Sequence, residues 1–112
     1  MWTITGLALA LCLMAVPAFG ADWRQVSSND SYLWYDRDSV DIDEEDYLTF
    51  SVYRGAWSDP ATLAANAVIV SVDCVDGYFE TWNASTQKWD DAPSGFVTDA
   101  LDDLAYGICY GE

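Results

Sequence analysis

The densest group of residues that could do chemistry is the acidic run from Asp36 to Asp46. Calcium needs several oxygen ligands on a flexible loop, and this run supplies many. An EF-hand loop starting at Asp36 would require a polar ligand at Val40 and a glycine at Asp41, so that motif fails. We therefore predict a solvated acidic turn without a tight calcium site, and a looser site remains the alternative. The run contains Asp36, Asp38, Asp41, Asp43, Glu44, Glu45 and Asp46.

A second candidate is the pair formed by Asp73 and Glu80. Between them lies Asp76-Gly77, a strong signal for a two-residue hairpin turn. Such a turn sets Cys74 opposite Phe79, and it sets Asp73 opposite Glu80. Facing carboxylates destabilise a sheet unless a cation neutralises them. A nearby arginine is the ordinary remedy, and a catalytic carboxylate pair is the alternative.

The residues needed for most enzymatic mechanisms are missing. The chain contains no histidine, which removes the usual general base and the commonest zinc ligand. Paired cysteines offer no thiol nucleophile, and no serine has a partner that would activate it. We therefore predict no enzymatic activity, no catalytic or metal-binding residues and no cofactor.

Tryptophans are the better candidates for recognition. Trp57 and Trp89 lie in polar, loop-like surroundings, where an aromatic side chain can anchor a protein partner. Packing in the core or on a sheet face is the alternative for these two residues. It is also the expected role of the remaining tryptophans after the leading segment, Trp23, Trp34 and Trp82.

The leading segment determines the compartment. Residues 4–16 form an apolar run, the segment 17–21 that follows contains the small residues Ala18, Gly20 and Ala21, and the first charged side chain is Asp22. This pattern is typical of a secretory signal peptide at residues 1–20, followed by one domain at residues 21–112. An uncleaved membrane anchor is the alternative, although the run is short for spanning a bilayer. We expect an exported protein that is periplasmic, on the cell surface or secreted, with no membrane span after cleavage.

Export makes the cysteines informative. Cys74 and Cys109 are the only cysteines after the leading segment, and thiols tend to pair in an oxidising compartment. The predicted disulfide closes a loop of about 35 residues, which stabilises the fold by about 3–4 kcal/mol in the chain-entropy model.

The charge balance limits the partners. The chain has 4 basic and 19 acidic residues, for a formal net charge of −15. Such a protein repels nucleic acid and anionic lipid and attracts cationic proteins or metals. The alternative is that the charge only maintains solubility. Disorder is excluded because hydrophobic residues make up 52% and aromatic residues 15% of the chain.

Strand patterns dominate the mature chain. Residues 47–53 alternate cleanly, so Leu48, Phe50 and Val52 share one face of a strand. Further strands are expected at 23–26, 31–35, 66–75 and 78–82, and Asp59 and Pro60 favour a helical turn at 61–63. An apolar stripe runs from Phe96 to Cys109 at helical spacing, with Ser94 as the expected N-cap. We predict an α+β domain: an antiparallel sheet of about five or six strands, with a C-terminal helix packed on one face and tied by the disulfide.

Several of these features occur together in one known family. Trp23 opens the mature chain, Tyr35-Asp36-Arg37-Asp38-Ser39-Val40 follows, Cys74 closes a valine-rich strand, and an amphipathic helix ends at Cys109. In this order the chain resembles the bacterial surface-adhesin protein E family. The resemblance implies a curved antiparallel sheet with a helix tethered by one disulfide. It also implies an envelope or secreted protein that binds host or matrix proteins, sometimes as a homodimer.

The leading functional prediction is therefore an exported, non-enzymatic, adhesin-like binding domain of the bacterial envelope. Its contacts would come from exposed aromatic and acidic groups. Two alternatives remain: an acidic inhibitor of a cationic enzyme such as lysozyme, and a structural periplasmic protein. Opposite charge would speed the encounter of such an inhibitor with its target.

Overall fold

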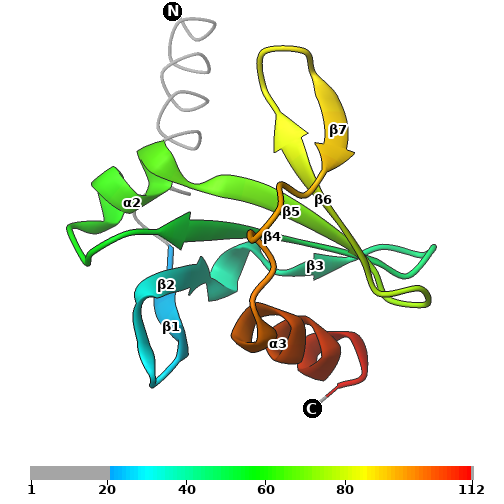
Figure 1. Cartoon of the computed structure of the whole chain (residues 1–112), viewed down its shortest axis with the longest axis horizontal. Helices are drawn as coiled ribbons and strands as arrows, with labels where there is room; N and C mark the ends of the chain where they lie inside the picture. Colours follow the sequence, from blue (N-terminus) through cyan, green and yellow to red (C-terminus); the bar gives the residue numbers. More distant parts are fainter. Residues whose placement is uncertain (1–20, 112) are drawn as a thin grey trace, which may run out of the picture.

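The protein is described here by a computed structural model of residues 21–111, so the predicted signal segment at residues 1–20 lies outside the described residues. Antiparallel strands form one sheet with the order β1-β2-β4-β5-β6-β7, and a short β3 pairs with β4 (Figure 1). The strands are β1 (Trp23–Ser27), β2 (Asp30–Asp36), β3 (Asp41–Ile42), β4 (Tyr47–Arg54), β5 (Val68–Asp73), β6 (Tyr78–Asn83) and β7 (Lys88–Asp91). The helices are the 3-10 turn η1 (Arg37–Ser39), α2 (Pro60–Asn66) and α3 (Asp99–Cys109).

The alternating pattern of β4 decides which sheet face is buried. Leu48, Phe50 and Val52 are each at most 1% exposed. Val70 and Val72 of the neighbouring strand β5 are buried beside them. The predicted half-buried strand is thus confirmed, and its apolar side forms the core.

Helix α3 covers this apolar face. Its Leu101 and Ala105 are buried in the same cluster as the strand residues, and Figure 1 shows the helix below the sheet. The predicted antiparallel sheet with a C-terminal helix is confirmed. The α+β class is confirmed only in part, because the described chain is mostly sheet. The cluster contains Leu33, Leu48, Phe50, Val52, Val70, Val72, Phe79, Leu101 and Ala105.

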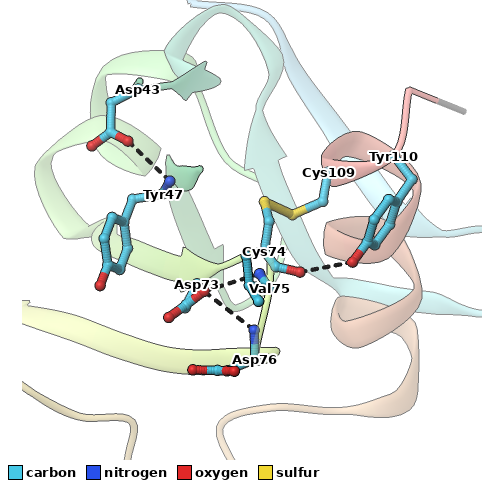
Figure 2. Close-up of a disulfide and its surroundings, with 8 residues drawn as sticks. All are labelled: Asp43, Tyr47, Asp73, Cys74, Val75, Asp76, Cys109 and Tyr110. Carbon is cyan, nitrogen blue, oxygen red and sulfur yellow. Dashed lines mark hydrogen bonds between the residues drawn. A yellow bond between two sulfur atoms is a disulfide. The ribbon is translucent and has the colours of Figure 1, made fainter. Parts of the chain in front are cut away.

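A disulfide joins the end of α3 to the end of β5. The Cα atoms of Cys74 and Cys109 are 5.6 Å apart, which is ordinary for a bridged pair. The Tyr110 hydroxyl donates a hydrogen bond of 2.9 Å to the Cys74 carbonyl beside it (Figure 2). The predicted pairing of these cysteines is confirmed.

The connection between β5 and β6 differs from the prediction. It is a four-residue turn, residues 74–77, in place of the two-residue turn at Asp76-Gly77. The Asp73 carboxylate accepts hydrogen bonds from the backbone N–H groups of Val75 at 2.9 Å and Asp76 at 3.2 Å. Gly77 has a φ of 71°, which glycine adopts without steric strain. Asp73 therefore serves the turn and fixes its length.

This longer turn changes the strand register. Val72 lies opposite Phe79, and Asp73 lies opposite Tyr78. The predicted pairing of Cys74 with Phe79 is therefore wrong. The predicted facing pair of Asp73 and Glu80 is wrong for the same reason, and Ser71 occupies the position opposite Glu80.

Strand β7 was not expected from the sequence. Its residues, Lys-Trp-Asp-Asp, are all exposed and show no apolar alternation. It forms because it pairs with β6 across a turn in which Gln87 has a φ of 55°. Trp89 therefore lies on a strand, contrary to the loop-like setting predicted for it.

Helix α2 follows the sequence signals. Asp59 is its N-cap, accepting a hydrogen bond from the Thr62 N–H at 2.9 Å, and Pro60 occupies the first turn. Leu63 is fully buried. The predicted helical turn is confirmed, and the helix continues to Asn66.

The N-cap of α3 is Thr98, and not Ser94 as predicted. Its hydroxyl accepts a hydrogen bond of 3.2 Å from the Leu101 N–H, while residues 94–96 form a turn before the helix.

We expect Thr98→Ala to lower the free energy of unfolding by about 1 kcal/mol, measured by urea denaturation. Thr98→Ser keeps the cap and should retain nearly all of this stability. A loss from Ser94→Ala as large as that from Thr98→Ala would contradict the assignment.

Candidate functional site

The sheet face opposite α3 carries a mixture of aromatic, acidic and hydroxyl side chains. Side chains alternate between faces along a strand, so the neighbours of the buried residues point away from the core. We call this side of the sheet the open face. Its residues are Tyr47, Thr49 and Ser51 of β4, Ile69, Ser71 and Asp73 of β5, Tyr78, Glu80 and Trp82 of β6, and Trp89 and Asp91 of β7.

Strand register brings the polar members of this face together. Asp73 lies between Tyr47 on one side and Tyr78 on the other. In the next row Glu80 lies between Ser71 and Asp91. Residues that are far apart in the sequence thus form adjacent rows across three or four strands.

A shallow hollow of about 290 Å³ lies within the open face. Thr49 and Ser71 contribute from the two central strands, and Ser71 is only 7% exposed. Tyr47 and Trp89 contribute aromatic rings that are more than a third exposed. The lining residues are Asp43, Tyr47, Thr49, Ser71, Glu80 and Trp89.

The turn between β3 and β4 positions Asp43 at this hollow. One oxygen of its carboxylate accepts a hydrogen bond from the Glu45 N–H at 2.8 Å. The same oxygen accepts a second one from the Tyr47 N–H at 3.0 Å (Figure 2). Asp46 completes the turn with a φ of 65°. In Figure 2 the side chains of Asp43 and Tyr47 lie away from the disulfide and Tyr110.

Carboxylates dominate the charged groups of the open face. Asp73 is the main cause that raises the pKa of Tyr47 above its ordinary value, and Glu45 and Glu80 add to the effect. A hydrogen bond to the Asp91 carboxylate raises the pKa of Tyr78. Both tyrosines resist ionisation because a phenolate would add charge to a surface that already carries several carboxylates.

Basic residues do not offset this charge. Arg24 forms a salt bridge of 2.9 Å with Asp22 next to β1. The Arg54 guanidinium donates a hydrogen bond of 2.6 Å to the Phe96 carbonyl and lies 5.4 Å from the centre of that ring. Lys88 alternates with Trp89 on β7 and therefore lies on the other face. Of the arginines that were expected to neutralise Asp73 and Glu80, Arg24 and Arg54 are thus engaged elsewhere, and Arg37 of η1 forms no salt bridge within the described residues.

These pKa shifts predict how the protein responds to alkaline pH. With raised native pKa values, folded Tyr47 and Tyr78 keep their protons where unfolded tyrosines lose them. Stability linked to them is fully present below a pH of about 10 and is lost as the pH rises through the raised values. Ultraviolet titration should show late-ionising tyrosines. Asp91→Asn should move Tyr78 to a lower pKa, whereas Asp90→Asn, on the other face, should not. Identical curves for these two variants would contradict the assignment.

Residues 21–111 contain no group of three or more acidic or cysteine side chains arranged to hold a metal ion. The acidic run from Asp36 to Asp46 is instead divided among η1, β3 and the turn before β4. Two of its carboxylates, those of Asp36 and Asp43, serve local structure. Asp36 accepts hydrogen bonds from the N–H groups of Asp22 and Asp38, and Asp43 holds the turn.

No family model, curated protein or solved structure matches this chain. Within the described part of the chain, no helix has the length and apolar character needed to cross a membrane.

The two predicted partner-binding tryptophans are not brought together. Trp57 lies in the loop after β4, is 52% exposed, and its ring centre is 4.8 Å from that of Trp34. Trp89 lines the hollow, and its ring centre is 5.3 Å from that of Trp82. Trp34 pairs with Tyr53 at the end of β4, whereas the hollow includes Tyr47 at the start of the same strand.

Sequence reasoning missed Tyr47 and Ser71 as site residues. The alternation alone places both residues on the face opposite Leu48 and Val72. It does not predict which residues lie beside them on the neighbouring strands, because that depends on the strand register and on the unexpected strand β7. A second hollow of about 230 Å³ lies beside the disulfide, between the β5–β6 turn and α3, but its lining includes the core residues Val72, Phe79 and Ala105.

Proposed function

We propose that the protein is an exported, non-enzymatic binding domain that holds a cationic protein partner against its open face. The observation that supports this most directly is the combination of exposed aromatic rings and unneutralised carboxylates on one sheet face. Aromatic residues supply contact area at protein interfaces, and complementary charge supplies specificity and fast encounter. The opposite face is unsuitable because α3 covers it.

Two features support export. The apolar segment at residues 4–16 has the composition of a signal peptide. The bond between Cys74 and Cys109 is of a kind that persists in oxidising compartments. Together with the resemblance to the protein E family, they favour an adhesin-like role in the bacterial envelope, with a host or matrix protein as partner.

The charge of the open face favours binding of a different protein there over binding of a second copy of this chain. Two open faces brought together would each present Asp73, Glu80 and Asp91, and like charges would repel. A homodimer through this face is therefore the less favoured arrangement. Light scattering at low and high salt tests it, because such a dimer would form only when the repulsion is screened.

A capture experiment with matched variants tests the proposed face. The purified protein is immobilised and exposed to envelope and host extracts, and the captured proteins are identified. We expect cationic proteins, and we expect the variant Asp73→Asn/Glu80→Gln/Trp89→Ala to capture them at least about tenfold less, which corresponds to about 1.4 kcal/mol.

The control makes the same kinds of change on the other side of the sheet. Asp102→Asn/Asp103→Asn/Tyr106→Ala alters two exposed acids and one exposed aromatic residue on α3. This control variant should capture the same amount of the cationic proteins as the unmodified protein. Equal losses from both triple variants would mean that only net charge matters, and the open-face proposal would be abandoned.

Inhibition of a cationic enzyme such as lysozyme is the second candidate, and the same acidic face favours it. Association steered by charge slows steeply as ionic strength rises. We expect an inhibitor to lose potency between low and high salt in a lysozyme assay. Unchanged enzyme activity at low salt would remove this candidate and leave the adhesin-like role.

A further inference from the structure

We infer that the hollow in the open face is a pocket for one arginine side chain presented by the protein partner. This inference rests on the proposed function, since it names what the open face would recognise. It is carried by three separate features of the hollow: its aromatic sides, its carboxylates and its serine hydroxyl group.

The aromatic sides come from two separate strands. Tyr47 begins β4 and Trp89 lies on the edge strand β7, and their exposed fractions are 38% and 39%. Rings that line a hollow while remaining exposed present their π-systems to a ligand. A cation over such a ring is attracted by its quadrupole, most strongly for tryptophan. A guanidinium group, being planar, also stacks on the ring.

The carboxylates supply the opposite charge at the same place. Glu80 lies on β6 beside Asp91, and Asp43 is fixed by two backbone hydrogen bonds of its own. A guanidinium group can donate two parallel hydrogen bonds to one carboxylate, which an ammonium group cannot reproduce. Glu80 makes no salt bridge within the described residues, so its carboxylate can accept them.

Ser71 gives an observation independent of charge. It is more than nine-tenths buried, yet it lies on the open side of β5 and lines the hollow. Its hydroxyl takes part in none of the side-chain hydrogen bonds found among residues 21–111. The one fully buried side-chain polar atom without a partner among residues 21–111 is Trp23 Nε1, so the Ser71 hydroxyl still reaches solvent through the hollow, where it can accept a hydrogen bond from a ligand group.

The size of the hollow favours an organic cation over a metal ion. Its volume of about 290 Å³ is several times the roughly 30 Å³ that a water molecule occupies in the liquid. The acidic side chains around it do not form a metal-binding group in the described chain. The planar guanidinium group of an arginine side chain fits this geometry better than a metal ion does.

Nuclear magnetic resonance titration of the purified protein tests the inference. The probes are N-acetyl-arginine methylamide, its neutral isostere N-acetyl-citrulline methylamide, and N-acetyl-lysine methylamide. We expect saturable shifts centred on Ser71, Glu80 and Trp89 with the arginine probe, and at least tenfold weaker binding of the citrulline probe. Equal binding of arginine and citrulline, or shifts spread over all acidic surfaces, would overturn the inference. So would a lysine probe that binds as tightly as arginine.

Variants locate the binding. Glu80→Gln preserves shape and should weaken arginine binding at least fivefold, and Trp89→Ala should have a similar effect. Asp103→Asn removes one exposed charge from α3 and should leave binding unchanged. If Glu80→Gln binds the arginine probe as tightly as the unmodified protein, the pocket assignment is wrong.

The outcome is separable from that of the proposed function. If the arginine probe binds in the hollow but no cationic protein is captured through the open face, the pocket stands and the proposed function fails. If capture depends on the open face but Glu80→Gln and Ser71→Leu leave it intact, the proposed function stands and the arginine pocket fails.

Discussion

Phe50→Ala is expected to lower the free energy of unfolding by about 3–5 kcal/mol. Phe50 is 1% exposed at the centre of the core, pairs with Val70, and meets the ring of Tyr35 edge-on with centroids 6.3 Å apart. Its removal leaves a cavity between the sheet and α3 and breaks this aromatic contact. For a domain of this size the loss is a large fraction of the total stability, and it is measured by chemical denaturation.

Two controls make this prediction specific to the core. Phe50→Leu keeps most of the volume and should cost clearly less. Ile69→Ala on the open face removes an aliphatic side chain that is 44% exposed, and it should cost less than about 1 kcal/mol. If Ile69→Ala destabilises the protein as much as Phe50→Ala, the two faces of the sheet have been assigned the wrong way round.

The parts of the fold that could be predicted are those encoded by a local repeating pattern. Alternation along β4 is visible within seven residues, so Leu48, Phe50 and Val52 could be placed in the core without knowing their neighbours. Leu101 and Ala105 follow in the same way from the helical stripe. The disulfide could be predicted because only two cysteines follow the leading segment.

The parts that could not be predicted depend on competition between local signals. Asp73 accepts two backbone hydrogen bonds in the β5–β6 turn, and these override the shorter turn that Asp76-Gly77 favours. The resulting shift of two residues keeps each side chain on its predicted face, so the core was right while the pair of Asp73 and Glu80 was wrong.

The candidate site was harder to predict than the core for a related reason. Its residues come from the β3–β4 turn, β4, β5, β6 and β7, and none of these segments alone has the pattern of a binding site. Trp89 was identified by its chemistry. Its neighbours across the sheet required the pairing of β6 with β7, a strand whose four exposed residues carry no local signal.

Loss of the bond between Cys74 and Cys109 is expected to lower the melting temperature by about 12–32 °C. The two cysteines are 35 residues apart, and closing a loop of that length stabilises the folded state by about 3–4 kcal/mol relative to the unfolded chain. In a domain of this size each kcal/mol shifts the midpoint by about 4–8 °C. Calorimetry with and without a thiol reductant, and on Cys74→Ser/Cys109→Ser, measures this shift.

The effect should be concentrated at the C-terminal end of α3. The N-terminal end of α3 does not depend on the disulfide, because Thr98 caps it and Leu101 is buried. The C-terminal turn around Cys109 is attached to the sheet by the disulfide. Hydrogen exchange in the reduced protein should therefore rise first near Cys109. Tyr110→Phe removes only the hydrogen bond to the Cys74 carbonyl and should cost less than about 1 kcal/mol. A reduced protein that melts at the same temperature as the oxidised one would mean that packing through Leu101 and Ala105 alone holds α3 on the sheet.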